Sequence, residues 1–416
     1  MTFLFIVSEA FICYPKHQHD LRRKPVNKEA IKEKRYRSVF QSTTSLLEFP
    51  LFSVPVGMYN IPGEDPDRPN KVNQDAYFHA SFQYERSGKP ITSTYVGVLD
   101  GHGLKGHLVS RFMAHQMPFR IQEQFAMNDS SSNTEDFLVS NVPSMIKAAF
   151  ENAHEDAIQN KTIPAGRSGT TCVMMMLEES DQLEKEDLNS VSSTISQTMY
   201  IANVGDSRAV IGIPPTYPNS DFDSFKTIHK TNNRIETSAH VSIEIKKSSP
   251  INDSQMWKAL ALTKETTVKI PEENERIEMG EGRVDSMGNV FYGPVGISMT
   301  RALGDAVMLR AGVIPSPIVD CFQIIFEKDS EKKNNRKCGM VVVLGSDGIF
   351  DVMKNEEVID YAVKSMTTGN DMNDSLDISK INAAAESIAK EAKQRWQGGL
   401  PLEVKSDDIT CAVIVI

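Results

Sequence analysis

The residues of this chain that could do chemistry are aspartates placed next to runs of apolar residues. They are Asp75, Asp100, Asp206, Asp347 with Asp351, and Asp407 with Asp408. An apolar run of roughly four to eight residues is typical of a buried strand, and a strand delivers the residue beyond its end to a fixed place at the sheet edge. Several strands can therefore bring several of these carboxylates to one point.

Carboxylates that converge in this way need a cation between them, because like charges at close range repel and raise one another's pKa. Ligands that are all oxygen select hard divalent ions, so we expect Mg²⁺ or Mn²⁺ rather than zinc. Asp100 and Asp347 are each followed by glycine, which lets the backbone turn sharply beside an ion. One Asp-Gly after a strand is most often only a turn, but its recurrence favours a metal site. His102, in the sequence DGHG, is a candidate proton donor beside that site.

The elements that must position these aspartates are short strands and a few helices. We expect strands at Tyr95–Leu99, Thr170–Leu177, Thr198–Val204, Ala209–Ile213, Met340–Leu344 and Ile409–Ile416. Apolar residues spaced three and four apart predict helices at Leu104–Phe125, Val142–Asn160 and Asn382–Trp396. Many strands with helices in separate blocks indicate an α+β fold in which antiparallel sheets pack face to face.

Changes in composition divide the chain into an extension and one domain. Residues 14–45 are polar and basic, so we expect residues 1–50 to be a flexible N-terminal extension and residues 51–416 to form the domain. The stretch 178–197 is rich in Ser, Glu and Asp and predicts a hairpin with a disordered tip. The stretch 214–250 is broken by Pro, Asn and Ser and predicts an irregular insertion.

Composition excludes several classes of protein. The 416 residues include 45 Lys and Arg against 55 Asp and Glu, and the net charge of −10 argues against a nucleic-acid partner. Five scattered cysteines without a CxxC pair indicate neither a disulfide framework nor a zinc knuckle. No apolar run reaches the roughly 18–20 residues that span a bilayer. We therefore expect an intracellular protein, cytoplasmic or nuclear. A secreted or membrane-anchored protein is the alternative, resting on the apolar start at residues 1–14.

A series of segments, taken in chain order, resembles the motifs of the type 2C metal-dependent protein serine/threonine phosphatases. They are NQDAYF (73–78), VGVLDGHG (96–103), SGTTCV (168–173), ANVGDSRAV (202–210), TRALGD (300–305), LGSDGIFDVM (344–353) and SDDITCAVIVI (406–416). The weaker motifs LALT (260–263), ERIEMGEGRV (275–284) and GVIPSP (312–317) also match. The resemblance covers Pro55 to Ile416, and its specificity comes from the number and order of the motifs.

The resemblance implies two antiparallel sheets in a central sandwich flanked by helical layers. It also implies hydrolysis of phosphoserine and phosphothreonine on phosphorylated protein substrates by a metal-activated water, without a covalent enzyme intermediate. Two ions of Mg²⁺ or Mn²⁺ are expected, with a third that binds more weakly. We expect the protein to be a monomer.

The resemblance also assigns roles to single residues. The expected metal-binding residues are Asp100 as the bridge between two metals, the Gly101 carbonyl at one of them, Asp347 and Asp407 at the other, and Asp206 and Asp351 at the third. By the same resemblance, His102 is the general acid for the leaving oxygen, and Asp75 holds a metal-bound water.

Two positions depart from the family pattern. Gln74 stands where a glutamate ligand is common, so it can offer the metal an amide oxygen but no charge. The phosphate-gripping arginine is missing, since Asn70 stands near its place with Arg68 and Lys71 beside it. We expect Lys71 to bind the phosphate as a point charge, without the fork of arginine. These departures leave open an alternative, a weak or inactive pseudophosphatase that acts as a binding module, although the retained aspartates count against it.

Overall fold

The apolar run in strand β6 (Cys172–Glu179) shows how the centre of the molecule is built. Successive side chains of a strand point to opposite faces of its sheet. Met174 and Met176 pack into one core, and Val173 and Met175 pack into another. The run is apolar without alternation because both faces of this strand are buried.

The structure is a computed structural model, and it describes residues 54–86, 89–128, 135–179, 194–215, 240–245, 257–327, 340–367, 378–398 and 405–416. These residues belong to one compact unit. The extension expected over residues 1–50 lies outside them, as do residues 180–193 of the expected hairpin tip and most of the expected insertion at 214–250. None of the helices in the described ranges combines the length and the hydrophobicity that a membrane span needs.

Six strands form the first sheet, in the order β2–β3–β6–β7–β15–β9. The other members are β2 (Ala76–Arg86), β3 (Lys89–Leu99), β7 (Thr194–Val204), β9 (His240–Ile245) and β15 (Ile318–Glu327). Neighbours are antiparallel except β9 and β15, which run parallel. Strands β6 and β7 pair from Cys172 with Val204 to Glu179 with Gln197, as the expected hairpin requires.

Five antiparallel strands form the second sheet, in the order β1–β17–β16–β8–β10. They are β1 (Val56–Ile61), β8 (Arg208–Ile213), β10 (Lys258–Ala261), β16 (Val341–Gly345) and β17 (Ile409–Val415). Val96 and Met175 of the first sheet share one buried cluster with Val342 and Ile414 of the second. The two sheets therefore pack face to face.

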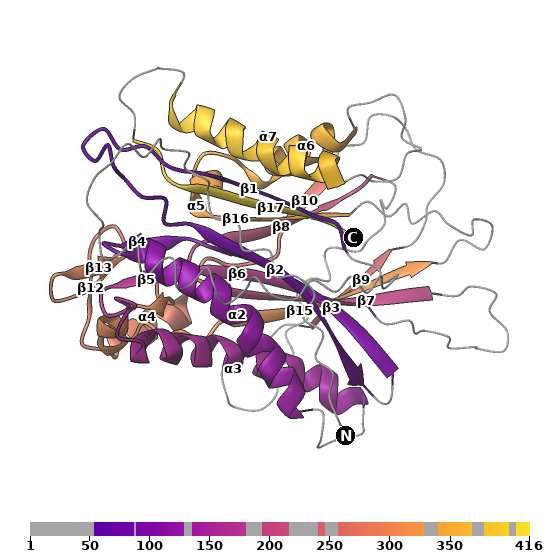
Figure 1. The fold of residues 1–416 in the computed structure, drawn as a ribbon, viewed down its shortest axis with the longest axis horizontal. Coiled ribbons are helices and arrows are strands. Elements are labelled where there is room, and N and C mark those ends of the chain that lie inside the picture. The colour runs from indigo at the N-terminus through magenta and orange to yellow at the C-terminus, as the bar shows by residue number, and fades with distance from the viewer. Residues whose placement is uncertain are drawn as a thin grey trace, which may run out of the picture. The chain divides into compact units, whose positions relative to one another are not determined.

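Helices cover the outer face of each sheet. Helices α2 (Gly106–Asn128) and α3 (Glu135–Gln159) pack on the first sheet, and α6 (Asn355–Thr367) and α7 (Ile378–Trp396) pack on the second. Figure 1 shows the resulting order of helices, sheet, sheet and helices. The expected α+β sandwich flanked by helical layers is confirmed.

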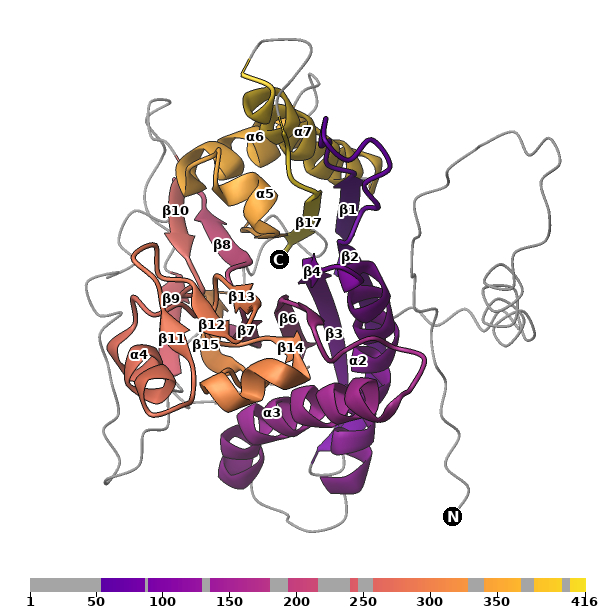
Figure 2. The same ribbon diagram turned by 90° about the vertical axis from the view of Figure 1, so that its left-hand side faces the viewer.

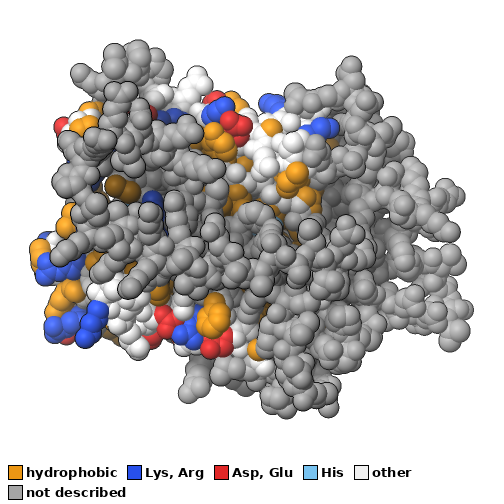
Figure 3. All heavy atoms as spheres, viewed as in Figure 1, with side chains coloured by type: hydrophobic (Ala, Val, Ile, Leu, Met, Phe, Trp, Pro, Cys, Tyr) orange, Lys and Arg blue, Asp and Glu red, His pale blue; other side chains and the backbone are white. Residues whose placement is uncertain are grey.

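A small sheet lies at one end of the sandwich. It consists of β11 (Arg283–Val284), β12 (Val290–Tyr292) and β13 (Val295–Ile297), and it packs with α4 (Pro271–Glu278) and the 3₁₀ helix η2 (Ala306–Ala311). Met279 and Met287 of this region are largely exposed. In Figure 3, hydrophobic and basic side chains lie beside one another at the edge where Figure 1 labels β12 and β13.

Three very short strands complete the end of the sandwich. They are β4 (Gly101–Gly103), β5 (Ser168–Thr170) and β14 (Leu303–Gly304), in the order β14–β5–β4. The expected strand Thr170–Leu177 is wrong at its start, because Thr171 separates β5 from β6. Its backbone N–H donates to the Asp100 carbonyl at 2.8 Å, so the chain changes sheets at this residue.

Candidate active site

Strand ends from both sheets meet at one place. Asp100 follows β3 of the first sheet, and Asp347 opens the short helix α5 (Asp347–Phe350) after β16 of the second. The Thr170 hydroxyl donates to the Asp100 carbonyl at 2.9 Å and fixes the backbone where it leaves the sheet. In Figure 2, β4 and α5 lie close together near the middle of the view. The ends of β3 and β16 thus lie near each other, and the metal-binding role expected of their aspartates stays a prediction.

Glycine is required where these segments approach each other. A Cβ atom at Gly101 would lie 2.4 Å from the Gln74 carbonyl oxygen, and one at Gly348 would lie 2.2 Å from the Asp408 carbonyl oxygen. Both distances are shorter than Cβ atoms tolerate. Glycine is thus needed after Asp100 and Asp347. The close neighbour in the structure is backbone, whereas the sequence analysis expected an ion.

The carboxyl groups of Asp75, Asp100 and Asp347 control one another's ionisation. Burial raises the pKa of all three, and nearby carboxylates raise it further: Asp347 and Asp75 act on Asp100, and Asp408 acts on Asp75. Asp100 and Asp347 act on each other's pKa, so the two carboxyl groups are neighbours. Oδ1 of Asp75 and Oδ1 of Asp347 are buried without a hydrogen-bond partner. A cation at this point would offset the repulsion between the carboxylates and give these oxygens a partner.

Asp407 and Asp408 are adjacent in the chain but differ in what their carboxylates do. Asp408 is buried and accepts from the backbone N–H of Gly63 at 2.6 Å and of Gln74 at 2.9 Å. The Asp407 side chain is 47% exposed. Asp408 therefore holds the chain, whereas the Oδ1 atom of the more exposed Asp407 accepts from the backbone N–H of Asp408 at 2.8 Å and lies 3.2 Å from Lys71 Nζ.

Gln74 is tied to the same region by its amide. Its side-chain Nε2 donates to the Gly103 carbonyl at 2.8 Å. Its backbone carbonyl accepts from the Ser110 hydroxyl at 2.5 Å. The hydrogen bond made by Nε2 fixes the orientation of the side-chain amide. If Gln74 binds a metal as expected, it does so through its Oε1 atom.

Lys71 points its ammonium at the end of the second sheet. Nζ lies 3.2 Å from Asp407 Oδ1 and 3.3 Å from Asp408 Oδ1, and the side chain is 14% exposed. Burial alone would lower the pKa of Lys71, but the two carboxylates outweigh it and the pKa is raised. Arg68 is bonded instead to Asp65, at 2.8 Å. Lys71 thus lies beside Asp407, an expected metal ligand. The phosphate contact expected of Lys71 stays a prediction.

Asp206 and Asp351 both act on the pKa of Asp347 and are therefore near it. Burial raises the pKa of both, and the charge of Asp206 raises the pKa of Asp351 and Asp347. The Ser298 hydroxyl donates to Asp206 Oδ2 at 3.0 Å, a contact that the sequence did not indicate. The two residues expected to share a third metal are therefore neighbours.

His102 pairs with a residue to which the sequence analysis gave no role. Its Nε2 lies 2.5 Å from Oδ2 of Asp305, the last residue of the motif TRALGD. Burial alone would lower the pKa of His102, but the carboxylates of Asp305, Asp206 and Asp347 outweigh it and the pKa is raised. The motif TRALGD was the only sign in the sequence that Asp305 has a role, and residue spacing did not connect it to His102.

The carboxylate cluster offers oxygen ligands but, among the residues that the structure describes, holds no ready-made set of three. Within the described ranges, no three His, Cys, Asp or Glu side chains are so arranged that they could hold a metal ion as they stand. The donor chemistry fits Mg²⁺ or Mn²⁺, because the clustered side chains offer oxygen atoms and two buried carboxylate oxygens lack a partner.

The part of the chain that holds these motifs matches a known protein family. The family described as Protein phosphatase 2C matches residues 70–238 and 252–396. The chain belongs to the protein phosphatase 2C family. A similar protein is "Probable protein phosphatase 2C 52" of Arabidopsis thaliana, 26% identical over 339 residues, which cover 78% of this chain and 59% of that protein. Another is "Probable protein phosphatase 2C 73" of Oryza sativa subsp. japonica, 27% identical over 352 residues, covering 77% and 64%. The chain thus matches less than two thirds of the length of either relative.

Solved structures share the protein phosphatase 2C fold with this chain. A serine-threonine phosphatase 2C from Toxoplasma gondii superposes with a TM-score of 0.51 at 13% identity, covering 87% of this chain and 99% of that one. A C. elegans sex determining protein gives a TM-score of 0.52 at 15% identity, covering 95% and 76%. At these identities the likeness concerns the fold alone.

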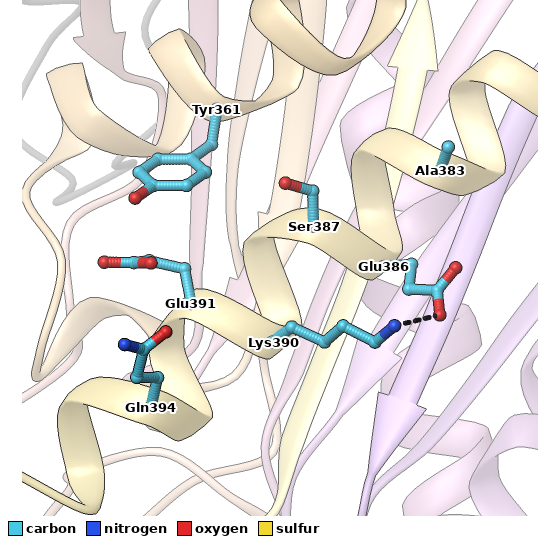
Figure 4. Close-up of a pocket in the computed structure, with 7 residues that line it drawn as sticks. All are labelled: Tyr361, Ala383, Glu386, Ser387, Lys390, Glu391 and Gln394. Carbon is cyan, nitrogen blue, oxygen red and sulfur yellow. Dashed lines mark ion pairs between the residues drawn. The ribbon is translucent and has the colours of Figure 1, made fainter. Parts of the chain in front are cut away.

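A hollow on the helical layer is separate from the carboxylate cluster. It has a volume of about 370 Å³ and is lined by Tyr361, Ala383, Glu386, Ser387, Lys390, Glu391 and Gln394 of α6 and α7. Lys390 pairs with Glu386 at 2.7 Å, and the Tyr361 hydroxyl points toward Glu391 (Figure 4). Because its charged side chains are already paired, we assign it no function in this phosphatase 2C chain.

Proposed function

We propose that the chain is a metal-dependent protein serine/threonine phosphatase that hydrolyses phosphoserine and phosphothreonine in phosphorylated proteins. The observation that carries this proposal is the meeting of Asp75 and Asp100 from one sheet with Asp347 from the other, with raised pKa values and unpaired buried oxygens. Family membership supports the reaction class, and the cluster supports dependence on a divalent cation.

The proposed metal ligands are Asp100, the Gly101 carbonyl, Asp347 and Asp407. When bound, Mg²⁺ or Mn²⁺ would lower the pKa of a water molecule toward neutrality and screen the charge of the phosphate that this water attacks. Asp75, which accepts from the Thr410 hydroxyl at 2.8 Å, is placed to orient that water with its unpaired oxygen.

The remaining residues of the cluster adjust charge around this centre. Asp206 and Asp351 are proposed to hold a third ion, which the resemblance to the family expects to bind more weakly. Gln74 offers an uncharged oxygen in place of a carboxylate. Lys71 adds a positive point charge where the phosphate dianion would lie.

His102 is proposed to donate a proton to the departing serine or threonine oxygen. An alkoxide is a poor leaving group, so proton donation contributes about 10²–10⁴-fold to such a reaction. The carboxylates that raise the pKa of His102 favour its protonated form.

The test is hydrolysis of a phosphoserine peptide and of para-nitrophenyl phosphate with Mn²⁺, with and without EDTA. We expect turnover that EDTA abolishes and that Asp100→Asn and Asp347→Asn reduce to background. Asp360→Asn, on helix α6, is the matched control and should keep full activity. Full activity of Asp100→Asn would refute the metal assignment.

A pseudophosphatase is the second candidate, favoured by the amide at Gln74 and by the pairing of Lys71 with Asp407. It predicts that phosphopeptides bind but that neither substrate is hydrolysed at any Mn²⁺ concentration. The same assay therefore separates the two functions.

A further inference from the structure

We propose that Asp305 is a positioning residue that fixes the orientation and the tautomer of the His102 ring. This inference rests on the proposed function, in which His102 protonates the leaving oxygen. Nε2 of His102 lies 2.5 Å from Oδ2 of Asp305. An ionised carboxylate only accepts hydrogen bonds, so Nε2 carries the hydrogen of this bond. Nδ1, which is buried without a partner, is then the nitrogen left to face the leaving oxygen.

Asp305 reaches His102 across the middle strand of the small sheet β14–β5–β4. Gly169 of β5 pairs with His102 on one side and with Gly304 on the other. A Cβ atom at Gly169 would lie 2.0 Å from Asp305 Oδ2. The bare backbone of Gly169 therefore leaves the space through which the carboxylate approaches the ring.

The backbone of Asp305 adopts a conformation that side chains rarely take. Its φ is +48°, and no other non-glycine residue in the described part of the chain has a positive φ. Gly304 before it has φ +84°. The left-handed conformation at a residue with a Cβ costs about 1 kcal/mol or more, so the surrounding structure must hold it there. Strain at a residue whose side chain contacts a proposed proton donor points to a role for that side chain.

Neighbouring elements brace this turn. The backbone N–H of Gly304 donates to Nδ1 of His154 on α3 at 3.1 Å, and the N–H of Asp305 donates to the Ser168 carbonyl at 3.1 Å. The Asp305 carbonyl accepts from Met308 at 2.7 Å. These bonds use only backbone atoms of Gly304 and Asp305, so the carboxylate itself is not needed to form the turn.

The Asp305 carboxylate is buried, yet it makes no hydrogen bond that the fold needs. The Asp305 side chain is 1% exposed, and its Oδ1 has no hydrogen-bond partner. Most buried side-chain polar atoms have a hydrogen-bond partner, so the unpaired Oδ1 of Asp305 is an exception that a structural role does not explain. The one bond it makes through Oδ2 is to the imidazole, as in sites where a carboxylate sets the tautomer of a catalytic histidine.

The test compares leaving groups in the full chain with Mn²⁺. Serine alkoxide needs a proton on departure, whereas para-nitrophenolate does not. We expect Asp305→Asn and Asp305→Gly to lower kcat for a phosphoserine peptide by about 100-fold, the lower end of a general acid's contribution, while kcat for para-nitrophenyl phosphate changes by less than about threefold. Asn and Gly both tolerate the left-handed conformation, so these variants should fold. Adding Asp305→Gly to His102→Gln should cause no further loss.

Two matched controls complete the experiment. Gly169→Ala should reproduce the leaving-group difference, because its Cβ would lie 2.0 Å from Asp305 Oδ2 and displace the carboxylate, and circular dichroism should show that it folds despite a contact of 2.7 Å with the Leu303 carbonyl oxygen. Asp156→Asn, which breaks an ion pair with Arg120 between α2 and α3, should change neither substrate. An equal loss on both substrates in the Asp305 variants would mean a structural role and would overturn the proposal.

A spectroscopic readout separates failure of this inference from failure of the proposed function. The Nε2 hydrogen of His102, bonded to a buried carboxylate, should give a strongly downfield-shifted proton resonance that both His102→Gln and Asp305→Gly remove. Its absence from the wild type would overturn the pairing whether or not the protein is active. Its presence in a protein that hydrolyses neither substrate would leave the pairing intact and overturn the phosphatase function.

Discussion

Lys71 places a fixed positive charge beside a proposed metal ligand, and this charge acts oppositely on cations and anions. Its ammonium lies 3.2 Å from Asp407 Oδ1 and 3.3 Å from Asp408 Oδ1. Asp408 is already held by backbone N–H groups, so Asp407 is the carboxylate that Lys71 shares with the site. A divalent ion at Asp407 must bind against the charge of Lys71, whereas a phosphate dianion gains from it.

Replacing Lys71 by methionine should therefore tighten metal binding and weaken substrate binding. Methionine has a similar length and no charge. We expect the affinity for Mn²⁺, measured by titration calorimetry without substrate, to rise about tenfold, or roughly 1.4 kcal/mol. The KM for a phosphopeptide should rise while kcat changes less. Lys390→Met removes an ammonium paired with an exposed carboxylate on α7 and should change neither quantity. Unchanged Mn²⁺ affinity in Lys71→Met would show that the ammonium does not act on the metal site.

The residues of the site differ in how visible they are in the sequence. Asp100 and Asp347 could be predicted because each ends an apolar strand, and their meeting follows from sheet geometry. Asp305 could not, because its role depends on a left-handed turn and on the missing side chain of Gly169. Neither feature has a sequence period, and His102 is 203 positions away in the chain.

At the scale of elements, one buried carboxylate ties helix α4 to the loop that ends in Asp305. Glu273 of α4 accepts from Arg301 at 2.6 Å, from Arg276 at 2.5 Å and from the Thr300 hydroxyl at 2.6 Å. Burial alone would raise the pKa of Glu273, but these bonds outweigh it and hold the pKa at about 2. The small sheet region is thus anchored by an ion pair beneath the segment that supports His102.

Glu273 should make the stability of the protein sensitive to acid. A carboxylate whose pKa is lower in the folded state stabilises the fold above its unfolded pKa, and this stability is lost as the pH falls through the folded pKa. For Glu273 the window runs from its usual value of 4.5 down to about 2 and corresponds to about 3 kcal/mol. Urea unfolding from pH 6 to pH 2.5 should therefore show a steeper loss for the wild type than for Glu273→Gln. Glu281→Gln, which breaks an exposed pair with Arg310, should follow the wild type. Parallel curves for wild type and Glu273→Gln would contradict the prediction.

The elements that the sequence shows best are those with a long apolar pattern. Strands β16 and β17 could be predicted because both of their faces are buried and nearly every residue is apolar, and for the same reason β3 and β7 could be predicted only at their apolar ends, Tyr95–Leu99 and Thr198–Val204. Helix α6 was missed although Val358, Ile359 and Ala362 have helical spacing and are buried. The strands β4, β5 and β14 have two or three residues each, too few for a period, and tertiary hydrogen bonds define them.

At the scale of the whole molecule, the carboxylate cluster is a point of repulsion between the two sheets. Asp75 precedes β2 and Asp100 follows β3 of the first sheet, and Asp347 opens helix α5 after β16 of the second. Burial and their mutual charges raise the pKa of all three, which means that bringing them together ionised costs folding free energy. The apolar core between the sheets offsets this cost. A divalent cation would convert the repulsion into a link between the sheets.

Divalent cations should therefore stabilise the protein as well as activate it. An ion that binds only the folded state adds about 2.7 kcal/mol at 100 times its Kd, which for a domain of this size is a rise in Tm of about 5 °C. We expect this rise in calorimetry with Mn²⁺, its reversal by EDTA, and no rise with NaCl at equal ionic strength. Asp347→Asn should lose the rise, yet without metal it should melt at or above the wild-type Tm, because it removes one of the repelling charges. Asp360→Asn should behave as the wild type. An equal rise in Tm for Asp347→Asn would place the stabilising ion away from the junction of the sheets. A lower metal-free Tm of that variant would show that Asp347 contributes to the fold through something other than its charge.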